Sequence, residues 1–220
     1  MSSGRETERL IARLAVQAGP VRPLAAPWRR ALLFLAGAVL VVGATVALRG
    51  LRPDLALVMA MPGRRLEWIA SLATGVLATF AAFHLAVPGR SAWWTVLPAP
   101  AALLWLGALG YGTVMDVRMM GMAHGMAWQP SWDCLRAIIA STVPMAGLMF
   151  LLLRFAASAR PGATAAHGTL AVAALAAAGA TLSHALDTAL MVLVWHIGTI
   201  ALLVAVALAG GQRIFRLLGR

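Results

Sequence analysis

Six long apolar runs follow one another along this chain, and they constrain its fold more than any other feature. The runs are Ala31–Leu48, Leu66–Val87, Trp93–Val114, Leu135–Leu153, His167–Leu182 and Thr188–Ala209. At a rise of about 1.5 Å per residue, most of them reach or nearly reach the ~30 Å hydrocarbon thickness of a bilayer. Backbone groups in lipid must pair within their own segment, and the alternating pattern of barrel strands is absent from these runs. The sequence therefore predicts an all-α, polytopic membrane protein, a bundle of six transmembrane helices.

The composition agrees with a membrane protein and argues against a nucleic-acid-binding one. Hydrophobic residues make up 61% of the 220 residues and charged residues 11%, whereas about a quarter of a soluble domain is charged. The net charge of +11 would suggest nucleic acid in a soluble protein. Here the 18 basic residues are all arginine and lie mostly at the ends of apolar runs, where lipid attraction and orientation explain them. We therefore predict membrane lipids as partners and no direct contact with nucleic acid.

The arginines also predict the orientation and the division of the chain. With the N-terminus inside, twelve arginines fall on the inner side and six on the outer side, which favours cytoplasmic N- and C-termini, although the first outer loop carries four of the six. Residues 1–30 then form a cytoplasmic N-terminal segment, 31–209 the transmembrane domain and 210–220 a basic cytoplasmic tail. The fifth run is short and alanine-rich, and only about five residues separate it from the sixth. Those two runs are predicted to form a tight helical hairpin.

The N-terminal segment contains a candidate partner-binding helix between Glu6 and Ala18. Leu10, Ile11 and Leu14 recur at the spacing of a 3.6-residue turn and would form one apolar stripe, with Arg13 beside it. A helix of about thirteen residues is marginal in isolation. A partner protein or the membrane surface must therefore stabilise it.

Methionines concentrate between the third and fourth apolar runs, on the predicted outer side. Five of the eleven lie in twelve residues, and a histidine and the single cysteine follow: Met115, Met119, Met120, Met122, Met126, His124 and Cys134. Thioethers are soft ligands for copper(I), so Met119, Met122, His124 and Cys134 form a candidate site for copper or another soft metal acting as a signal. Methionines are also oxidised to sulfoxides, and they fill irregular gaps at membrane edges. Metal binding, oxidant sensing and packing are therefore all open alternatives, and no resident cofactor is predicted.

Cys134 has no second cysteine in the chain with which to form a disulfide. One interpretation is a buried small apolar residue. The other is a thiol at the outer membrane edge that is open to oxidation, to a metal or to a second copy of the chain in a homodimer.

Four further residues are candidates for a structural or signal-relay role near the last apolar run. His184 and Asp187 lie in the short loop before it, where a negative charge at the helix N-terminus is favoured. Trp195 and His196 lie within the run itself, and ionisable groups in membrane helices are often functional. A haem held between His84 and His196 is disfavoured, because the two histidines are expected at different depths.

The sequence lacks the signatures of common enzyme classes. Walker loops, dinucleotide-binding glycine fingerprints and HisGluxxHis pairs are absent, and the seven acidic residues are scattered. We therefore predict that the protein is not an enzyme. A small transporter or a metal-handling protein that uses the Met/His/Cys loop is the alternative, although a transporter is expected to show internal repeats or broken helices.

Seven short motifs occur in an order and spacing that resemble one known family. They are ProValArgProLeu at 20–24, LeuArgProAsp at 51–54, ValProGly at 87–89, LeuTrpLeuGlyAlaLeuGlyTyrGly at 104–112, SerTrpAspCys at 131–134, His184 with AspThr at 187–188, and ValLeuValTrpHis at 192–196. From about residue 10 to 212 the chain resembles the NrsF family of six-helix inner-membrane anti-sigma factors, which hold an extracytoplasmic-function (ECF) sigma factor of the SigF kind. Each motif alone is weak, but the ordered set is specific.

The resemblance implies a function and a role for several residues. It implies a multi-pass protein of the bacterial inner membrane whose cytoplasmic N-terminal segment, with Leu10, Ile11, Arg13 and Leu14, binds the sigma factor. It also implies periplasmic residues that sense stress such as metals or oxidants, a cysteine among them. In the family a cysteine is usual just after GlyTyrGly, where this chain has Thr113. A switch between two cysteines of one chain is therefore not expected, and Cys134 would act with a second chain, a metal or the methionines.

Overall fold

The computed structural model describes residues 2–17, 25–125, 132–154, 156, 158–183 and 189–217, and these residues form helices joined by turns. The elements are α1 (Ser2–Gln17), α2 (Pro27–Arg49), α3 (Leu55–Ala60), α4 (Pro62–Leu85), η1 (Ala92–Thr95), α5 (Ala99–Gly125), α6 (Trp132–Leu153), α7 (Pro161–Ser183), α8 (Ala189–Met191), the π-helix η2 (Val192–Ile197) and α9 (Gly198–Leu217). The predicted all-α class is confirmed for this part of the chain.

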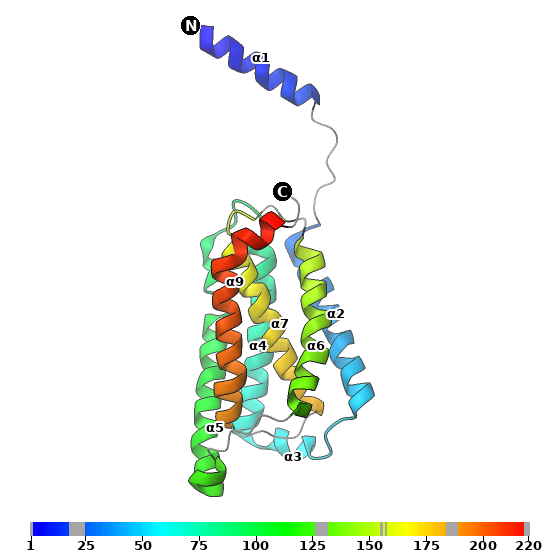
Figure 1. The fold of residues 1–220 in the computed structure, drawn as a ribbon, viewed down its shortest axis with the longest axis vertical. Coiled ribbons are helices and arrows are strands. Elements are labelled where there is room, and N and C mark those ends of the chain that lie inside the picture. The colour runs from blue at the N-terminus through cyan, green and yellow to red at the C-terminus, as the bar shows by residue number, and fades with distance from the viewer. Residues whose placement is uncertain are drawn as a thin grey trace.

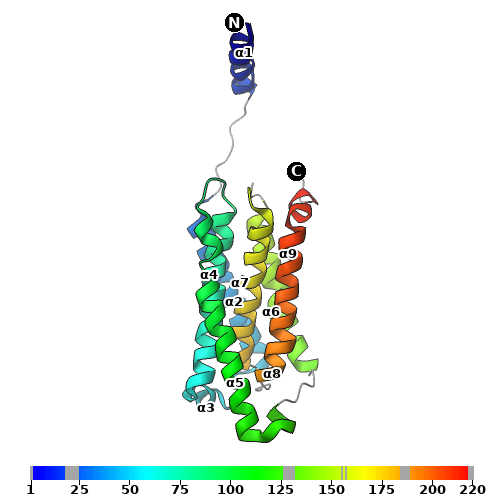
Figure 2. The same cartoon turned by 90° about the vertical axis from the view of Figure 1, so that its left-hand side faces the viewer.

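The long helices run up and down in a bundle whose two ends differ (Figures 1 and 2). The near end of the bundle is defined here as the end where α2 begins, and it also carries η1, the start of α7 and the end of α9. The far end is the end where α3 lies, and α5 projects beyond its neighbours there. Helix α1 stands apart from the bundle on the near side (Figure 1).

Four helical segments are long and apolar enough to cross a membrane: Pro27–Arg49, Pro62–Leu85, Ala92–Met122 and Pro161–Ser183. Two shorter apolar helical segments, Ile139–Leu153 and Gly198–Gly210, correspond to the predicted fourth and sixth runs. The predicted membrane-length helices are therefore seen for four of the six runs in the described residues.

Three helices begin at a proline, four or more residues earlier than the hydropathy pattern predicts. Helix α2 starts at Pro27 rather than Ala31, α4 at Pro62 rather than Leu66, and α7 at Pro161 rather than His167. Proline is favoured in the first helical turn, because its missing N–H has no intrahelical partner there and its φ is already helical. The fifth run, expected to be short, is consequently a helix of 23 residues.

The centre of the bundle is the pair α4 and α7, which together contact most of the other long helices. Helix α4 also packs against α2 and α5, and α7 against α6 and α9, so the predicted pairing of the last two runs is confirmed. Small side chains allow the central pair to approach closely. Gly75 of α4 faces Leu175 of α7, and a Cβ placed on Gly75 would lie 2.6 Å from the Leu175 Cγ and 3.1 Å from its backbone nitrogen.

Two clusters of buried side chains surround this central contact. One joins α2, α4, α6 and α7 around the aromatic pair Phe34 and Phe83, with Met145 and Met149 from α6. The other joins α4, α5 and α7 around Trp105 and Leu109, and residues of η2 and α9 pack against it. Both clusters include side chains of α7, which is why that helix contacts so much of the bundle.

The close approach at Gly75 makes a first prediction. Gly75→Val should push α4 and α7 apart, because the new methyl groups meet both side-chain and backbone atoms of Leu175. Overpacking of this kind costs about 1–3 kcal/mol, which should lower the unfolding temperature of the purified protein in detergent by several degrees. Gly107→Val is the matched control, because nothing lies within 4 Å of a Cβ at Gly107. Equal unfolding temperatures for the two variants would contradict this account of the contact.

Candidate functional site

A cluster of three charged side chains joins α4 to α5 at the far end. Arg64 Nη2 donates to Asp116 of α5 at 3.0 and 3.2 Å, and Arg64 Nη1 donates to Glu67 one turn along α4 at 3.2 Å. The side chains of Arg64 and Asp116 are each only 13% exposed. Charged groups at such depth need partners, and here one guanidinium serves two carboxylates. The cluster therefore fixes the far end of α5 against α4.

The loop that follows α2 is also held by an arginine. Arg52 Nε and Nη2 donate to the two carboxylate oxygens of Asp54 at 2.7 and 2.8 Å, and the Arg52 backbone N–H donates to the carbonyl of Leu182 in α7 at 3.0 Å. The hydrogen bond from Arg52 holds the pKa of the Asp54 carboxyl below its usual value. This loop is thereby tied to the far end of α7.

Two side chains of α4 donate hydrogen bonds to backbone carbonyls of α7. The Trp68 indole N–H donates to Ala178 at 3.0 Å, and the Ser71 hydroxyl donates to Ala174 at 2.9 Å. Both acceptors are carbonyls of a helix, so each forms a second hydrogen bond in addition to the helical one. These bonds lie one and two turns from Arg64, so the far half of α4 is bonded to α5 on one side and to α7 on the other.

Three methionines at the far end of α5 are exposed. The side chain of Met119 is 85% exposed and that of Met122 is 70% exposed, and Met120 is also exposed. The helix turns sharply at Gly121, whose φ of 75° and ψ of 165° suit a residue without a side chain. The structure thus places three of the predicted sensing methionines on the projecting end of α5, within about one turn of one another.

The other predicted sensing and relay residues lie at the edge of the described part of the chain or outside it. His124 and Cys134 belong to α5 and α6, and Trp195 and His196 to the π-helix η2, but only their backbones are described. Met126, His184 and Asp187 lie outside the described residues. Among the side chains that the structure describes, no group of three or more His, Cys, Asp or Glu could hold a metal ion. The predicted metal set stays a prediction.

The near end contains two polar side chains whose nitrogens are buried. Arg30, in the first turn of α2, lies over the Phe83 ring with its CZ atom 5.2 Å from the ring centroid, and its Nη1 has no hydrogen-bond partner among the described residues. His84 stacks on Trp94 of η1 with ring centroids 3.8 Å apart. The start of α2 and the short helix η1 are thus both packed on the last turn of α4.

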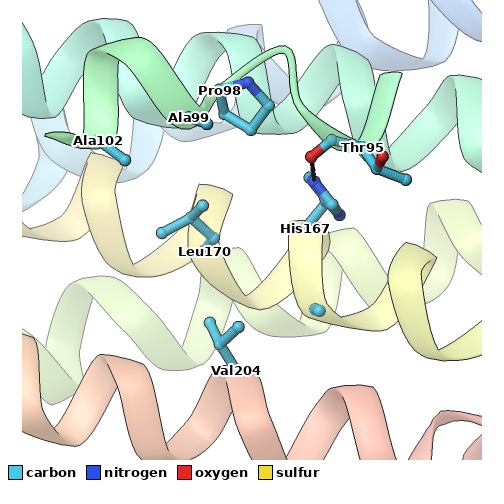
Figure 3. A pocket seen from close by; sticks show the side chains of 8 residues that line it. Thr95, Pro98, Ala99, Ala102, His167, Leu170 and Val204 are labelled. Carbon is cyan, nitrogen blue, oxygen red and sulfur yellow. Dashed lines mark hydrogen bonds between the residues drawn. The ribbon is translucent and has the colours of Figure 1, made fainter. Parts of the chain in front are cut away.

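An apolar cleft opens near the same end, between η1, α5, α7 and α9 (Figure 3). Its volume is about 170 Å³, and its lining residues are Thr95, Pro98, Ala99, Ala102, Ala166, His167, Leu170 and Val204. The imidazole ring of His167 is the polar ring in this lining, and both of its nitrogens lie against backbone carbonyls. Nε2 lies 3.0 Å from the Thr95 carbonyl oxygen, and Nδ1 lies 2.7 Å from the Ala163 carbonyl oxygen. His167 therefore acts as a bridge between η1 and α7 rather than as a ligand-binding group.

Helix α1 presents its apolar stripe to solvent. Leu10, Ile11 and Leu14 are 57%, 60% and 57% exposed, and Arg13 is exposed beside them. The predicted helix is confirmed from Glu6 to Gln17 and begins earlier, at Ser2, whereas Ala18 lies outside the described residues. Every side chain of α1 that is described is exposed, so the bundle leaves this stripe uncovered.

The sequence reasoning missed the contacts of Arg64, Glu67, Trp68 and Asp116. A signal was present for two of them, because Arg64 and Glu67 have the i, i+3 spacing of a helical ion pair. Asp116 is a carboxylate next to a long apolar run, which by itself flags a buried partner. The sequence could not pair Asp116 with Arg64, because the two lie 52 residues apart.

In the described residues the fold therefore defines an all-helical protein with four helices both long and apolar enough to cross a membrane and an amphipathic helix outside the bundle. Its sequence matches the model of the NrsF family, described as negative regulator of sigma F, over residues 14–217. The chain belongs to this family, and the resemblance of the motifs is confirmed. The matched region begins at Leu14, so Leu10, Ile11 and Arg13 precede it. No curated protein and no solved structure matches the chain.

Proposed function

We propose that this protein is an anti-sigma factor of the bacterial inner membrane that holds an ECF sigma factor through α1 and releases it when a periplasmic signal arrives. Membership of a family of negative sigma regulators supports a sigma factor as the partner. The exposed apolar stripe of α1 is the observation that carries the proposal. Such a regulator acts by binding, so we assign no chemical reaction to the chain.

The proposal places the near end of the bundle in the cytoplasm and the far end in the periplasm. By the helix ends that they adjoin, the arginines at 29, 30, 90, 154 and 160 belong to the near end, and those at 49, 52, 64, 65, 118 and 136 to the far end. Two of the far-end arginines, Arg52 and Arg64, are paired with carboxylates, which supports the orientation despite the four arginines from Arg49 to Arg65. Carboxylates of the near side are confined to Glu6 and Glu8.

The lengths of the remaining helices support a proposal of six crossings. Helix α6 has 22 residues, which at about 1.5 Å per residue is about 33 Å long and sufficient to cross the ~30 Å core. The succession α8, η2 and α9 extends from Ala189 to Leu217 and is longer still. With α2, α4, α5 and α7 they would make six spans, and an even number of spans would leave both termini on one side of the membrane.

The partner of α1 is argued from the stripe itself. Three large apolar side chains lie on one face of this 16-residue helix. Each contributes roughly 1.5–3 kcal/mol to the binding free energy if a partner covers it fully. A helix laid in an apolar groove is a common mode of recognition, and its anchors recur at i+3 and i+4, as Leu14 does after Ile11 and Leu10. Arg13 borders the stripe and can pair with a carboxylate of the sigma factor.

The receiver of the signal is proposed to be the projecting end of α5, with Cys134 at the start of α6. Exposed thioethers of Met119, Met120 and Met122 are accessible to a soft metal such as copper(I) or to an oxidant, and His124, Met126 and Cys134 would act with them. No cofactor is proposed in the resting protein. The bundle is proposed to have a holding and a releasing state. To change the ratio of releasing to holding molecules from about 1:99 to 99:1, the signal must bind or favour the releasing state about 10⁴-fold more strongly.

The proposed topology can be tested with reporter fusions. Fusions after Arg30, Pro88 and Arg160 should report a cytoplasmic location, and fusions near Gly121 and His184 a periplasmic one, because the apolar helices alternate in direction. Alkaline phosphatase and green fluorescent protein activities provide the two readouts. A periplasmic signal at Arg30 would overturn the orientation.

The stripe of α1 makes a second prediction of the proposed function. Replacing Leu10 and Leu14 together with Asp should weaken sigma binding at least about 100-fold and raise sigma-dependent transcription without any stimulus, because two apolar contacts are lost and two charges are desolvated. The matched control is Ala12→Asp with Val16→Asp, which adds the same charges on the opposite face. Transcription that stays repressed in the Leu10/Leu14 variant, at normal membrane levels, would exclude the stripe as the contact.

A third prediction concerns the proposed sensing residues. Met119→Leu with Met122→Leu should blunt the transcriptional response to copper, since the swap removes the sulfur ligands while changing packing by less than about 1.5 kcal/mol. Cys134→Ala should abolish the response to hypochlorous acid if the thiol is the oxidised group. Non-reducing gels of the unchanged chain would reveal a disulfide-linked dimer. Met59→Leu with Met61→Leu is the control pair at the same end. Wild-type responses to both stimuli in both variants would refute the sensing role.

A further inference from the structure

We propose that Arg64 and Asp116 form a latch between α4 and α5 that holds the bundle in its resting state, and that Glu67 retains the guanidinium when the latch opens. The proposal rests on the proposed function, because it identifies the contact through which a change at the far end would reach the helix that holds the sigma factor. None of the three residues belongs to the proposed sensing or sigma-binding sets.

The latch is a buried contact between two different helices. Of the ion pairs Arg52–Asp54, Arg64–Glu67 and Arg64–Asp116, the last joins residues of two helices that are 52 positions apart in the chain. One Nη2 nitrogen lies within 3.2 Å of both carboxylate oxygens of Asp116. Removing one partner from a buried pair is costly, because the other charge is left unpaired. The pair can therefore hold α5 in place as long as both charges are present.

Glu67 gives the cluster a second arrangement. It lies on the same helix as Arg64 and binds a different nitrogen, so the Arg64–Glu67 pair does not depend on the position of α5. When α5 moves away, Arg64 keeps a carboxylate partner inside the bundle. Asp116 can move with the projecting end of α5 toward water, where a carboxylate is well solvated. Opening therefore leaves neither charge buried alone, and this makes two stable arrangements feasible.

The latch lies beside the segment that is proposed to receive the signal. Asp116 precedes Met119 by three residues, which is less than one helical turn, and Met119 is the most exposed of the methionines on α5. A ligand that draws Met119 and Met122 together, or a sulfoxide that must be solvated, acts on the same turn of α5 that carries the latch.

Helix α4 connects the latch to the near end. Beyond Arg64 it donates hydrogen bonds to α7 from Trp68 and Ser71, and it ends at the Phe83 ring that lies under Arg30 of α2. Arg30 is in the first turn of α2, the helix that follows α1 along the chain. A shift of α4 that accompanies opening would therefore act on the attachment point of α1.

Two readouts test separately whether Arg64 and Asp116 hold α4 and α5 together and whether this contact controls release of the sigma factor. Asp116→Asn keeps the shape of the side chain and removes the charge that Arg64 binds, and Asp54→Asn is the matched control at the other far-end pair. The first readout is transcription dependent on the sigma factor, without stimulus, in the otherwise unchanged chain. The second is crosslinking by a short bifunctional thiol reagent between Gly63→Cys and Tyr111→Cys, positions in contact across α4 and α5, in a Cys134→Ser background.

Asp116→Asn should raise unstimulated transcription on the order of tenfold and lower the crosslinking yield, whereas Asp54→Asn should change neither. The exchange Arg64→Glu with Asp116→Arg keeps one guanidinium between two carboxylates, and it should restore both readouts. An unchanged crosslinking yield in Asp116→Asn overturns the latch. A lowered yield with unchanged transcription overturns its role as a relay. If deletion of the whole chain leaves transcription unchanged, the proposed function fails, and the crosslinking result still decides whether Arg64 and Asp116 hold the helices together.

Discussion

The close contact between α4 and α7 is the interaction on which the rest of the bundle depends. In a bilayer, lipid is as apolar as a leucine side chain, so helices are held together by packing and by hydrogen bonds between them. Both occur along this contact, where Gly75 accommodates Leu175 and where Trp68 and Ser71 donate to carbonyls of α7. The other long helices pack on one or both members of the pair. A change in this contact would therefore alter the position of every helix around it.

The apolar runs predicted the order and type of the helices, but not where α4 and α7 begin. A hydropathy pattern excludes Arg64 from α4 because it scores each residue as if it were alone. In the fold Arg64 has two carboxylate partners, and the ring nitrogens of His167 likewise lie against the carbonyls of Ala163 and Thr95. Satisfied polar groups can enter a buried helix at little cost, and a single sequence does not say which groups are satisfied.

The candidate site was predictable where a pattern was local. The stripe of α1 and the methionines of α5 follow from spacing along one helix, whereas the pairing of Arg64 with Asp116 depends on how two helices meet. Thr113 illustrates the same limit. It stands where the family usually has a cysteine, and its hydroxyl donates to the Leu109 carbonyl of its own helix at 3.0 Å. That hydroxyl is satisfied without a second helix, so thiol chemistry in this chain rests on Cys134.

The composition of α7 has a mechanical consequence. Most of its buried side chains are alanine, glycine or threonine, so the surface that it offers to α4 and α9 has shallow ridges. Neighbouring helices interlock less on such a surface than on one of leucine and phenylalanine, and small sliding movements need few rotamer changes. Specific points such as the Leu175 side chain seated at Gly75 then define the register between helices. The middle of the bundle is suited to shear, with α7 as the stationary element along which its neighbours slide.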